Sequence, residues 1–203
     1  NRQDDLSGQG GLCAAGVVFM TLAGVSRVLR ARGWWSVERP APDLLAALDL
    51  VALATVADVA PLAGLNRAFV TKGVSVMRNR ARVGLAALMD AARLEGPPRP
   101  YHLGFALGPR INAGGRIGDA GLGARLLTLS DPVEAGQIAQ NLDRLNAERQ
   151  AIEKRAVEEA IAQAEAQFVK SNRMNCLVVA DDDWHPGVVG LIASRLKERF
   201  KIP

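Results

Sequence analysis

LGPRINAGGRIGD, residues 107–119, combines turn-forming glycine and proline with two arginines and an asparagine. Its paired glycines, Gly114 and Gly115, can adopt positive φ and leave backbone N–H groups exposed. Its arginines, Arg110 and Arg116, offer planar guanidinium groups that match phosphate oxygens. Together these residue types predict a phosphate-binding turn. The same stretch also fits a glycine-rich turn between domains, with its arginines paired to carboxylates.

Hydrophobic periodicity predicts helices over most of the chain that precedes this stretch. Asp43 is expected to cap one of them, and the apolar run 50–59 ends near Asp58. A polar, glycine-rich loop is expected at 4–11. The helices are expected at 11–32, 43–51, 66–77, 83–94 and 101–107.

After the stretch, a short helix is expected at 122–129 and a much longer one from about 131 to 168. At about 1.5 Å per residue the long helix extends roughly 50 Å, a length typical of a helix that bridges two lobes. A turn at 171–175, a buried strand at Cys176–Ala180, a loop at 181–187 and a helix at 188–200 should follow. The order predicts an α/β protein: the helical end of one α/β domain at 1–130, a connecting helix at 131–170, and the start of a second α/β domain at 171–203.

Composition indicates a globular protein, with 49% hydrophobic and 23% charged residues. The formal net charge is +4. The segment from Arg67 to Arg116 contains nine basic residues and only two acidic ones. This basic middle suits an anion-binding cleft, although it also fits a solvated basic face. Cys13 and Cys176 lie in apolar runs, so both are expected as buried thiols in a reducing cytosol. No signal peptide and no apolar run of membrane-spanning length is evident.

Two positions outside the stretch are candidates for chemistry. Asp58 closes an apolar run, and a carboxylate there needs a partner: it either binds a cation or metal, or caps the helix or turn. Asp49 is a weaker candidate with a structural role. His185 follows the expected strand, where ligands collect, but it could instead cap the next helix. His102 fits a surface or capping histidine, and residues 181–183 fit a solvated turn.

Three stretches in the same order resemble the RecJ-type exonucleases of the DHH phosphoesterase family. They are DLVALATVADVAPL (49–62), GPRINAGGRIGDA (108–120) and WHPGVVG (184–190). The resemblance implies the end of a DHH domain at 1–130, including the glycine-rich motif, a connecting helix at 131–170, and the start of a DHHA1-type domain at 171–203. The implied activity is 5′→3′ hydrolysis of single-stranded DNA in recombination and repair.

The resemblance also implies site residues. Asp58 takes the place of a metal ligand in a site for two Mn²⁺ or Mg²⁺ ions, whose other ligands lie in motifs that these 203 residues lack. Isolated, the segment should be inactive. Expected partners are single-stranded DNA and a single-strand-binding protein or helicase, in the cytoplasm and without a membrane. Alternatives are a related phosphodiesterase of short oligonucleotides or cyclic dinucleotides, and a non-catalytic scaffold in a DNA-processing complex. The expected phosphate or DNA contacts are Arg110, Asn112, Gly114, Gly115, Arg116 and His185.

Overall fold

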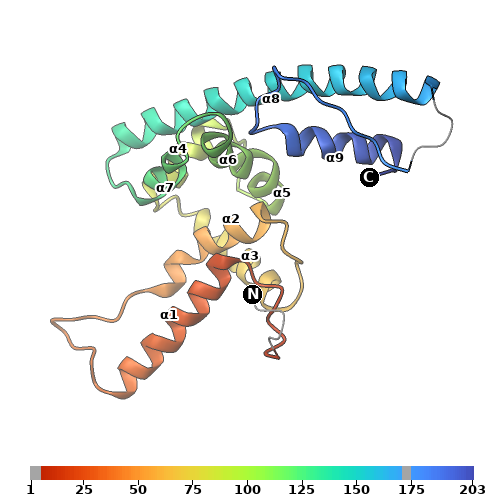
Figure 1. The fold of residues 1–203 in the computed structure, drawn as a ribbon. Helices are drawn as coiled ribbons and strands as arrows, with labels where there is room; N and C mark the ends of the chain where they lie inside the picture. The colour runs from red at the N-terminus through yellow and green to blue at the C-terminus, as the bar shows by residue number, and fades with distance from the viewer. Residues whose placement is uncertain (1–5, 171–174) are drawn as a thin grey trace. The chain divides into compact units, whose positions relative to one another are not determined.

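The computed structural model describes residues 6–170 and 175–203, and this part of the chain is mostly helical (Figure 1). Its helical elements are α1 (Ala14–Ala31), η1 (Leu44–Ala47), α2 (Leu48–Ala57), α3 (Gly64–Met77), α4 (Val83–Ala91), α5 (Pro100–His102), the π-helical turn η2 (Leu103–Leu107), α6 (Gly108–Ile117), α7 (Gly121–Thr128), α8 (Pro132–Lys170) and α9 (Val189–Phe200).

The helices expected from periodicity are confirmed, with ends that shift by a few residues. Asp43 caps η1, because its Oδ1 accepts hydrogen bonds from the backbone of Leu45 and Ala46. The long helix is confirmed as the 39-residue α8. The first residues of the loop expected at 4–11 lie outside the described part of the chain. The same holds for almost all of the turn expected at 171–175.

The strand expected at Cys176–Ala180 is not formed: residues 175–203 and 6–170 contain no strand, and Cys176 is exposed rather than buried. The segment is extended, but helix side chains take the place of a neighbouring strand. Gln167 Nε2 donates to Val178 O at 2.8 Å, and Gln163 bonds both backbone groups of Ala180. A strand is defined by a ladder of backbone bonds to a neighbouring strand; here the described partners are the glutamines of α8 and one backbone bond, from Leu177 N to Pro203 O at 2.8 Å.

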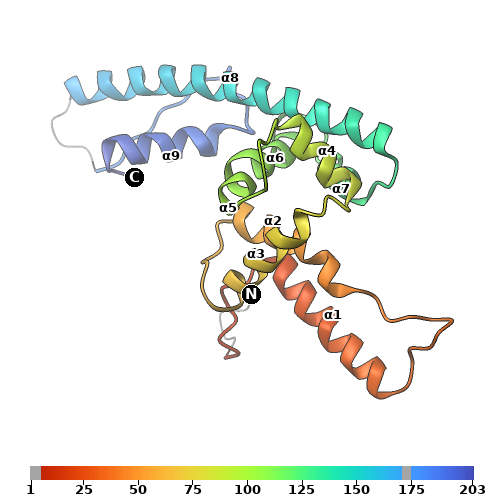
Figure 2. The ribbon, with the colours of Figure 1, turned by 180° about the vertical axis from the view of Figure 1, so that it is seen from behind.

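The chain divides into two compact units, residues 1–109 with 126–139, and residues 110–125 with 140–203. In the first unit α2 and α3 lie side by side (Figures 1 and 2). Gly73 of α3 permits this approach, because a Cβ there would lie 2.1 Å from Leu48 O and 2.5 Å from Ala52 Cβ. The contact places the second half of α3 against the first half of α2, so the two helices are antiparallel.

In the second unit α8 and α9 lie side by side (Figure 2), with small side chains of α8 packed against larger aliphatic side chains of α9. The α8 stripe recurs every four residues, and so does the facing stripe of α9, as ridge-into-groove packing requires. A core of alanine and aliphatic residues agrees with the low aromatic content of 4%. The two stripes are Ala156, Ala160 and Ala164 on α8, and Val188, Ile192 and Leu196 on α9 and its N-cap.

Helix α1 corrects one sequence expectation, because it is long and apolar enough to cross a membrane by length and composition alone. One such helix is weak evidence, since helices that pack on protein pass the same test. In the first unit Phe19 of α1 packs edge-on against Phe69, with ring centroids 5.2 Å apart. Ser26 is buried, and Trp35 donates to its carbonyl.

Candidate functional site

Asp58 lies at the C-terminal end of α2, whose residues are mostly buried. The structure corrects one premise about it, because the carboxylate is exposed. Within the described part of the chain it makes no hydrogen bond or ion pair, so it does not cap the helix with its side chain. The end of a helix carries negative partial charge and disfavours a carboxylate. Helix stability therefore gives no reason for this aspartate, whereas a bound cation would.

The backbone after Asp58 is strained. Val59 N donates to Val56 O and Ala60 N donates to Thr55 O, both at 3.1 Å, which closes a Schellman motif. The motif needs a left-handed residue, normally glycine, and here Val59 adopts φ +55°. A β-branched residue in this conformation is an outlier, and such strain concentrates at functional sites.

Asn66, in the first turn of α3, holds the loop that follows Asp58. It is 4% exposed, and its Nδ2 donates to Pro61 O at 2.9 Å and to Gly11 O at 2.8 Å. Both acceptors belong to segments without regular structure. From the sequence this position was expected only as the start of a helix; the available signal was an asparagine four residues after the 49–62 motif.

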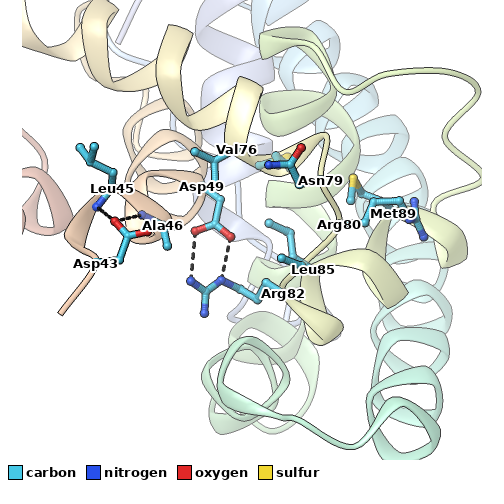
Figure 3. Close-up of a pocket in the computed structure, with 12 residues that line it drawn as sticks. Asp43, Leu45, Ala46, Asp49, Val76, Asn79, Arg80, Arg82, Leu85 and Met89 are labelled. Atoms are coloured by element: carbon cyan, nitrogen blue, oxygen red, sulfur yellow. Dashed lines mark hydrogen bonds and ion pairs between the residues drawn. The ribbon is translucent and has the colours of Figure 1, made fainter. Parts of the chain in front are cut away.

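Asp49, nine residues before Asp58, is structural, in agreement with the sequence analysis. It is 3% exposed and forms a two-pronged ion pair with Arg82, at 2.8 Å to Nε and 3.1 Å to Nη2 (Figure 3). The pair borders a cavity of about 400 Å³ in the first unit. Arg80 also borders it and is paired with Asp90 at 2.6 Å. Carboxylates thus already neutralise both arginines of this cavity.

The glycine-rich stretch is the main correction, because it is not a turn. Residues 108–117 form α6, and none of its glycines has positive φ. The glycines serve close packing instead: a Cβ on Gly114 would lie 2.7 Å from Asp119 O, and one on Gly118 would lie 2.9 Å from Leu145. Gly108, in the first unit, lies against Ala57, the neighbour of Asp58. Helical hydrogen bonding therefore replaces the exposed N–H groups that the turn would have supplied.

The two arginines of α6 have intramolecular partners in the second unit. Arg110 is bound to Asp143 of α8 at 2.8 Å. Arg116 Nη1 donates to Gly187 O at 3.0 Å, and a Cβ on Gly187 would lie 2.0 Å from Arg116 O. The end of α6 and the WHPGVVG loop are thus packed backbone to backbone. Asn112 and Gly115, three residues apart on the helix, are exposed, whereas Gly114 is buried.

His185 is exposed on that loop, and its Nδ1 accepts a hydrogen bond from Gly187 N at 3.0 Å. An accepting Nδ1 leaves the proton of the neutral ring on Nε2. The ring can therefore offer an N–H donor to a phosphate. Trp184 instead points to α8, where its Nε1 donates to Glu159 at 3.0 Å.

The remaining candidates have local roles. His102 Nδ1 accepts from Arg99 N, which makes it a capping histidine. Asp181 accepts from Asp183 N, as in a solvated turn. Among the described residues, no three His, Cys, Asp or Glu side chains gather as a metal site. Asp58 belongs to the first unit, and Arg110, Arg116 and His185 belong to the second.

Comparison with known proteins confirms the resemblance. The chain is 42% identical over 201 residues to the single-stranded-DNA-specific exonuclease RecJ of Dickeya dadantii, and 40% identical over 196 residues to RecJ of Escherichia coli. Each alignment covers 95% of this chain and 34% of the relative. The chain therefore spans about a third of the length of these curated relatives. No protein-family model matches it.

Solved structures agree. RecJ from Thermus thermophilus in complex with Mn²⁺ matches with a TM-score of 0.71 and 38% identity, over 81% of this chain and 24% of that one. The same protein in complex with Mg²⁺ matches with a TM-score of 0.70. The mostly helical fold of the described residues is thus similar to part of RecJ.

Proposed function

We propose that this chain is part of a metal-dependent exonuclease of the RecJ type, which hydrolyses single-stranded DNA in the 5′→3′ direction during recombination and repair. The supporting observation is that the relatives matched over 95% of the chain are single-stranded-DNA-specific exonucleases. The match includes the three motifs and Asp58. The finer layout is part of the proposal: the end of a DHH domain at 1–130, a connecting helix at 131–170, and the start of a DHHA1-type domain at 171–203.

In this proposal Asp58 is a ligand of Mn²⁺ or Mg²⁺. Carboxylate oxygens suit these hard cations, and Asp58 is exposed with no partner among the described residues. When bound, a pair of such ions would supply a hydroxide nucleophile and stabilise charge on the phosphate. The chain's own contribution is to hold the carboxylate in place, through the buried α2, the strained Val59 and the Asn66 bonds.

The second unit contributes phosphate contacts. Asn112, Gly115 and Arg116 are partly or fully exposed on α6, and His185 presents a ring N–H on the loop bonded to Arg116. Arg110 is a further proposed phosphate contact, from its position on α6 where Asp143 anchors it to α8. Gly114 contributes by its small size, because its buried position allows α6 to lie close to Leu142.

The surroundings of the enzyme belong to the same proposal. The enzyme is proposed to be soluble and cytoplasmic. A single-strand-binding protein or a helicase would supply the single-stranded substrate.

The test is degradation of 5′-labelled single-stranded DNA by the whole protein, with Mn²⁺, with Mg²⁺ and with EDTA. We expect short 5′-terminal products with either metal and none with EDTA. Equal activity in EDTA, or a preference for duplex DNA, would contradict the proposal.

A further inference from the structure

The basic residues of the first unit differ in whether they are paired. Arg80 and Arg82, beside the cavity of Figure 3, are neutralised by Asp90 and Asp49. On α3, by contrast, Arg67 and Lys72 are exposed, as is Arg78 at its C-cap, and none of the three side chains bonds to any described residue. The sequence contains no acidic residue between Asp58 and Asp90. Helix α3 therefore presents positive charge that the described fold leaves uncompensated.

These residues share one side of the helix. Steps of 100° per residue place Arg67, Thr71, Ser75 and Arg78 along one ridge, with Lys72 at its edge. All five are exposed, and the opposite side of α3 is buried. We call these five residues the α3 ridge. From Arg67 to Arg78 it extends about 16 Å at 1.5 Å per residue, enough for several consecutive phosphates of an extended strand.

The position of Arg67 is not explained by helix stability. It lies in the first turn of α3, where the helix dipole disfavours a cation. By contrast, Arg27, Arg30 and Arg32, the exposed cations of α1 and its C-cap, lie toward the C-terminal end of that helix, where the dipole favours them. Arg67 is therefore placed against local electrostatics, as expected when its charge serves a ligand, whereas the dipole favours Arg78 at the C-cap.

The ridge also leads away from the proposed metal ligand. Arg67 follows Asp58 by nine residues, and Asn66 ties the start of α3 to the loop after Asp58. Because Gly73 packs on Leu48, the far end of α3 lies toward the start of α2, away from Asp58. The cations thus follow one another outward from the Asp58 end.

We propose that the α3 ridge binds the phosphodiester backbone of single-stranded DNA and guides the strand along the protein surface from Asp58. The proposal rests on the proposed nuclease function and adds a binding surface to it. An acidic peptide is the other polyanion that a cationic helix could bind. Peptide interfaces are anchored by large apolar side chains, and α3 exposes none. The polar, small-residue ridge therefore favours a phosphate backbone.

The test compares two triple variants of the whole protein. In one, Arg67→Gln, Lys72→Gln and Arg78→Gln remove the ridge charges. In the other, Arg27→Gln, Arg30→Gln and Arg32→Gln remove the same charge from α1. Binding of fluorescein-labelled oligothymidylate is measured in EDTA across a salt series, together with the Tm of each variant. Cleavage of the same oligonucleotide by the unsubstituted protein is measured separately with Mn²⁺.

We expect the α3 variant to bind on the order of a hundredfold more weakly at 0.1 M salt, with a salt slope smaller by about two units, since each phosphate contact to a single strand contributes about 0.7. The α1 variant should retain its slope. The double variant Arg67→Lys with Arg78→Lys keeps both charges and should therefore also retain the salt slope. This variant separates an effect of lost charge from an effect of misfolding.

Equal salt slopes for the two triple variants would overturn the inference while the nuclease proposal stands. The same holds if the α3 variant loses affinity for a glutamate-rich peptide but not for the oligonucleotide. Absence of DNA cleavage and binding by the unsubstituted protein would instead overturn the proposed function itself.

Discussion

At the scale of single residues, Asp58 combines exposure, lack of a partner among the described residues, and an unfavourable helix end. Asp58→Asn should therefore abolish Mn²⁺-dependent turnover of single-stranded DNA by the whole protein. The Tm should stay the same or rise slightly, because the substitution removes a negative charge from a helix C-terminus, an effect worth about 0.3–1 kcal/mol. Asp182→Asn, which removes an exposed carboxylate elsewhere, is the matched control. Turnover near the unsubstituted rate would show that Asp58 is not a metal ligand.

Asn66 tests how that carboxylate is positioned. Asn66→Ala removes the two hydrogen bonds that Nδ2 donates to Pro61 O and Gly11 O, each worth about 0.5–1.5 kcal/mol. Asn66→Asp should be worse at neutral pH, because a carboxylate oxygen would face Pro61 O or Gly11 O. Urea unfolding measures both, with Asn79→Ala, at an exposed asparagine just beyond the opposite end of α3, as control. Equal stability of Asn66→Ala and Asn79→Ala would show that these bonds contribute nothing.

At the scale of elements, Glu159 of α8 holds the loop at 181–187 by accepting a hydrogen bond from Trp184 Nε1. The hydrogen bond from Arg155, followed by that from Trp184, lowers the pKa of Glu159 below its ordinary value of 4.5. A lowered folded-state pKa stabilises the protein above the unfolded pKa, and this stability is lost as the pH falls through the folded value. Trp184 fluorescence should therefore change at acid pH, below the ordinary range of a glutamate.

Glu159→Gln should remove that acid transition and leave the spectrum constant. Glu148→Gln, at a glutamate paired with Arg144 on the same helix, should retain it. An unaltered transition in Glu159→Gln would assign the fluorescence change to another group.

The end of α6 and the WHPGVVG loop form a second contact between elements. Arg116→Ala should weaken oligothymidylate binding by roughly tenfold or more, as expected for a charge-assisted bond of about 1.5–3 kcal/mol, and reduce the salt slope by about 0.7. Arg116→Lys should rescue binding in part. Gly187→Ala disturbs the same contact without removing charge, so it should lower the Tm and keep the slope. A lower Tm with an unchanged slope in Arg116→Ala would limit this arginine to packing.

At the scale of the whole molecule, the chain spans about a third of its curated relatives. Only Asp58 is proposed as a metal ligand, and the described residues form no cluster of three candidate ligands. The 203-residue chain alone should therefore show no Mn²⁺-dependent degradation of labelled single-stranded DNA. The whole protein under the same conditions is the positive control. Degradation by the purified chain would mean that the site is complete within it.

Local interactions made much of the fold predictable from the sequence. The periodicity of α8 and the Asp43 cap are confirmed because both depend on residues within a few positions of each other. The three motifs predicted the similarity to RecJ, since their residue types and order are properties of the sequence alone.

Tertiary contacts decided the rest. Glycine permits both a turn and a helix; α6 packs against Leu142 and the residue after it, Gly118, packs against Leu145, both on the distant α8, which favours the helix. The segment 176–180 has the composition of a strand, but the described structure pairs it with glutamine side chains of α8. Asp49 and Asp58 belong to the same apolar motif, yet Arg82, 33 residues beyond Asp49, reaches only the first of them. The sequence by itself determined which residues could bind metal or phosphate; long-range packing decided which of them are already occupied by other parts of the protein.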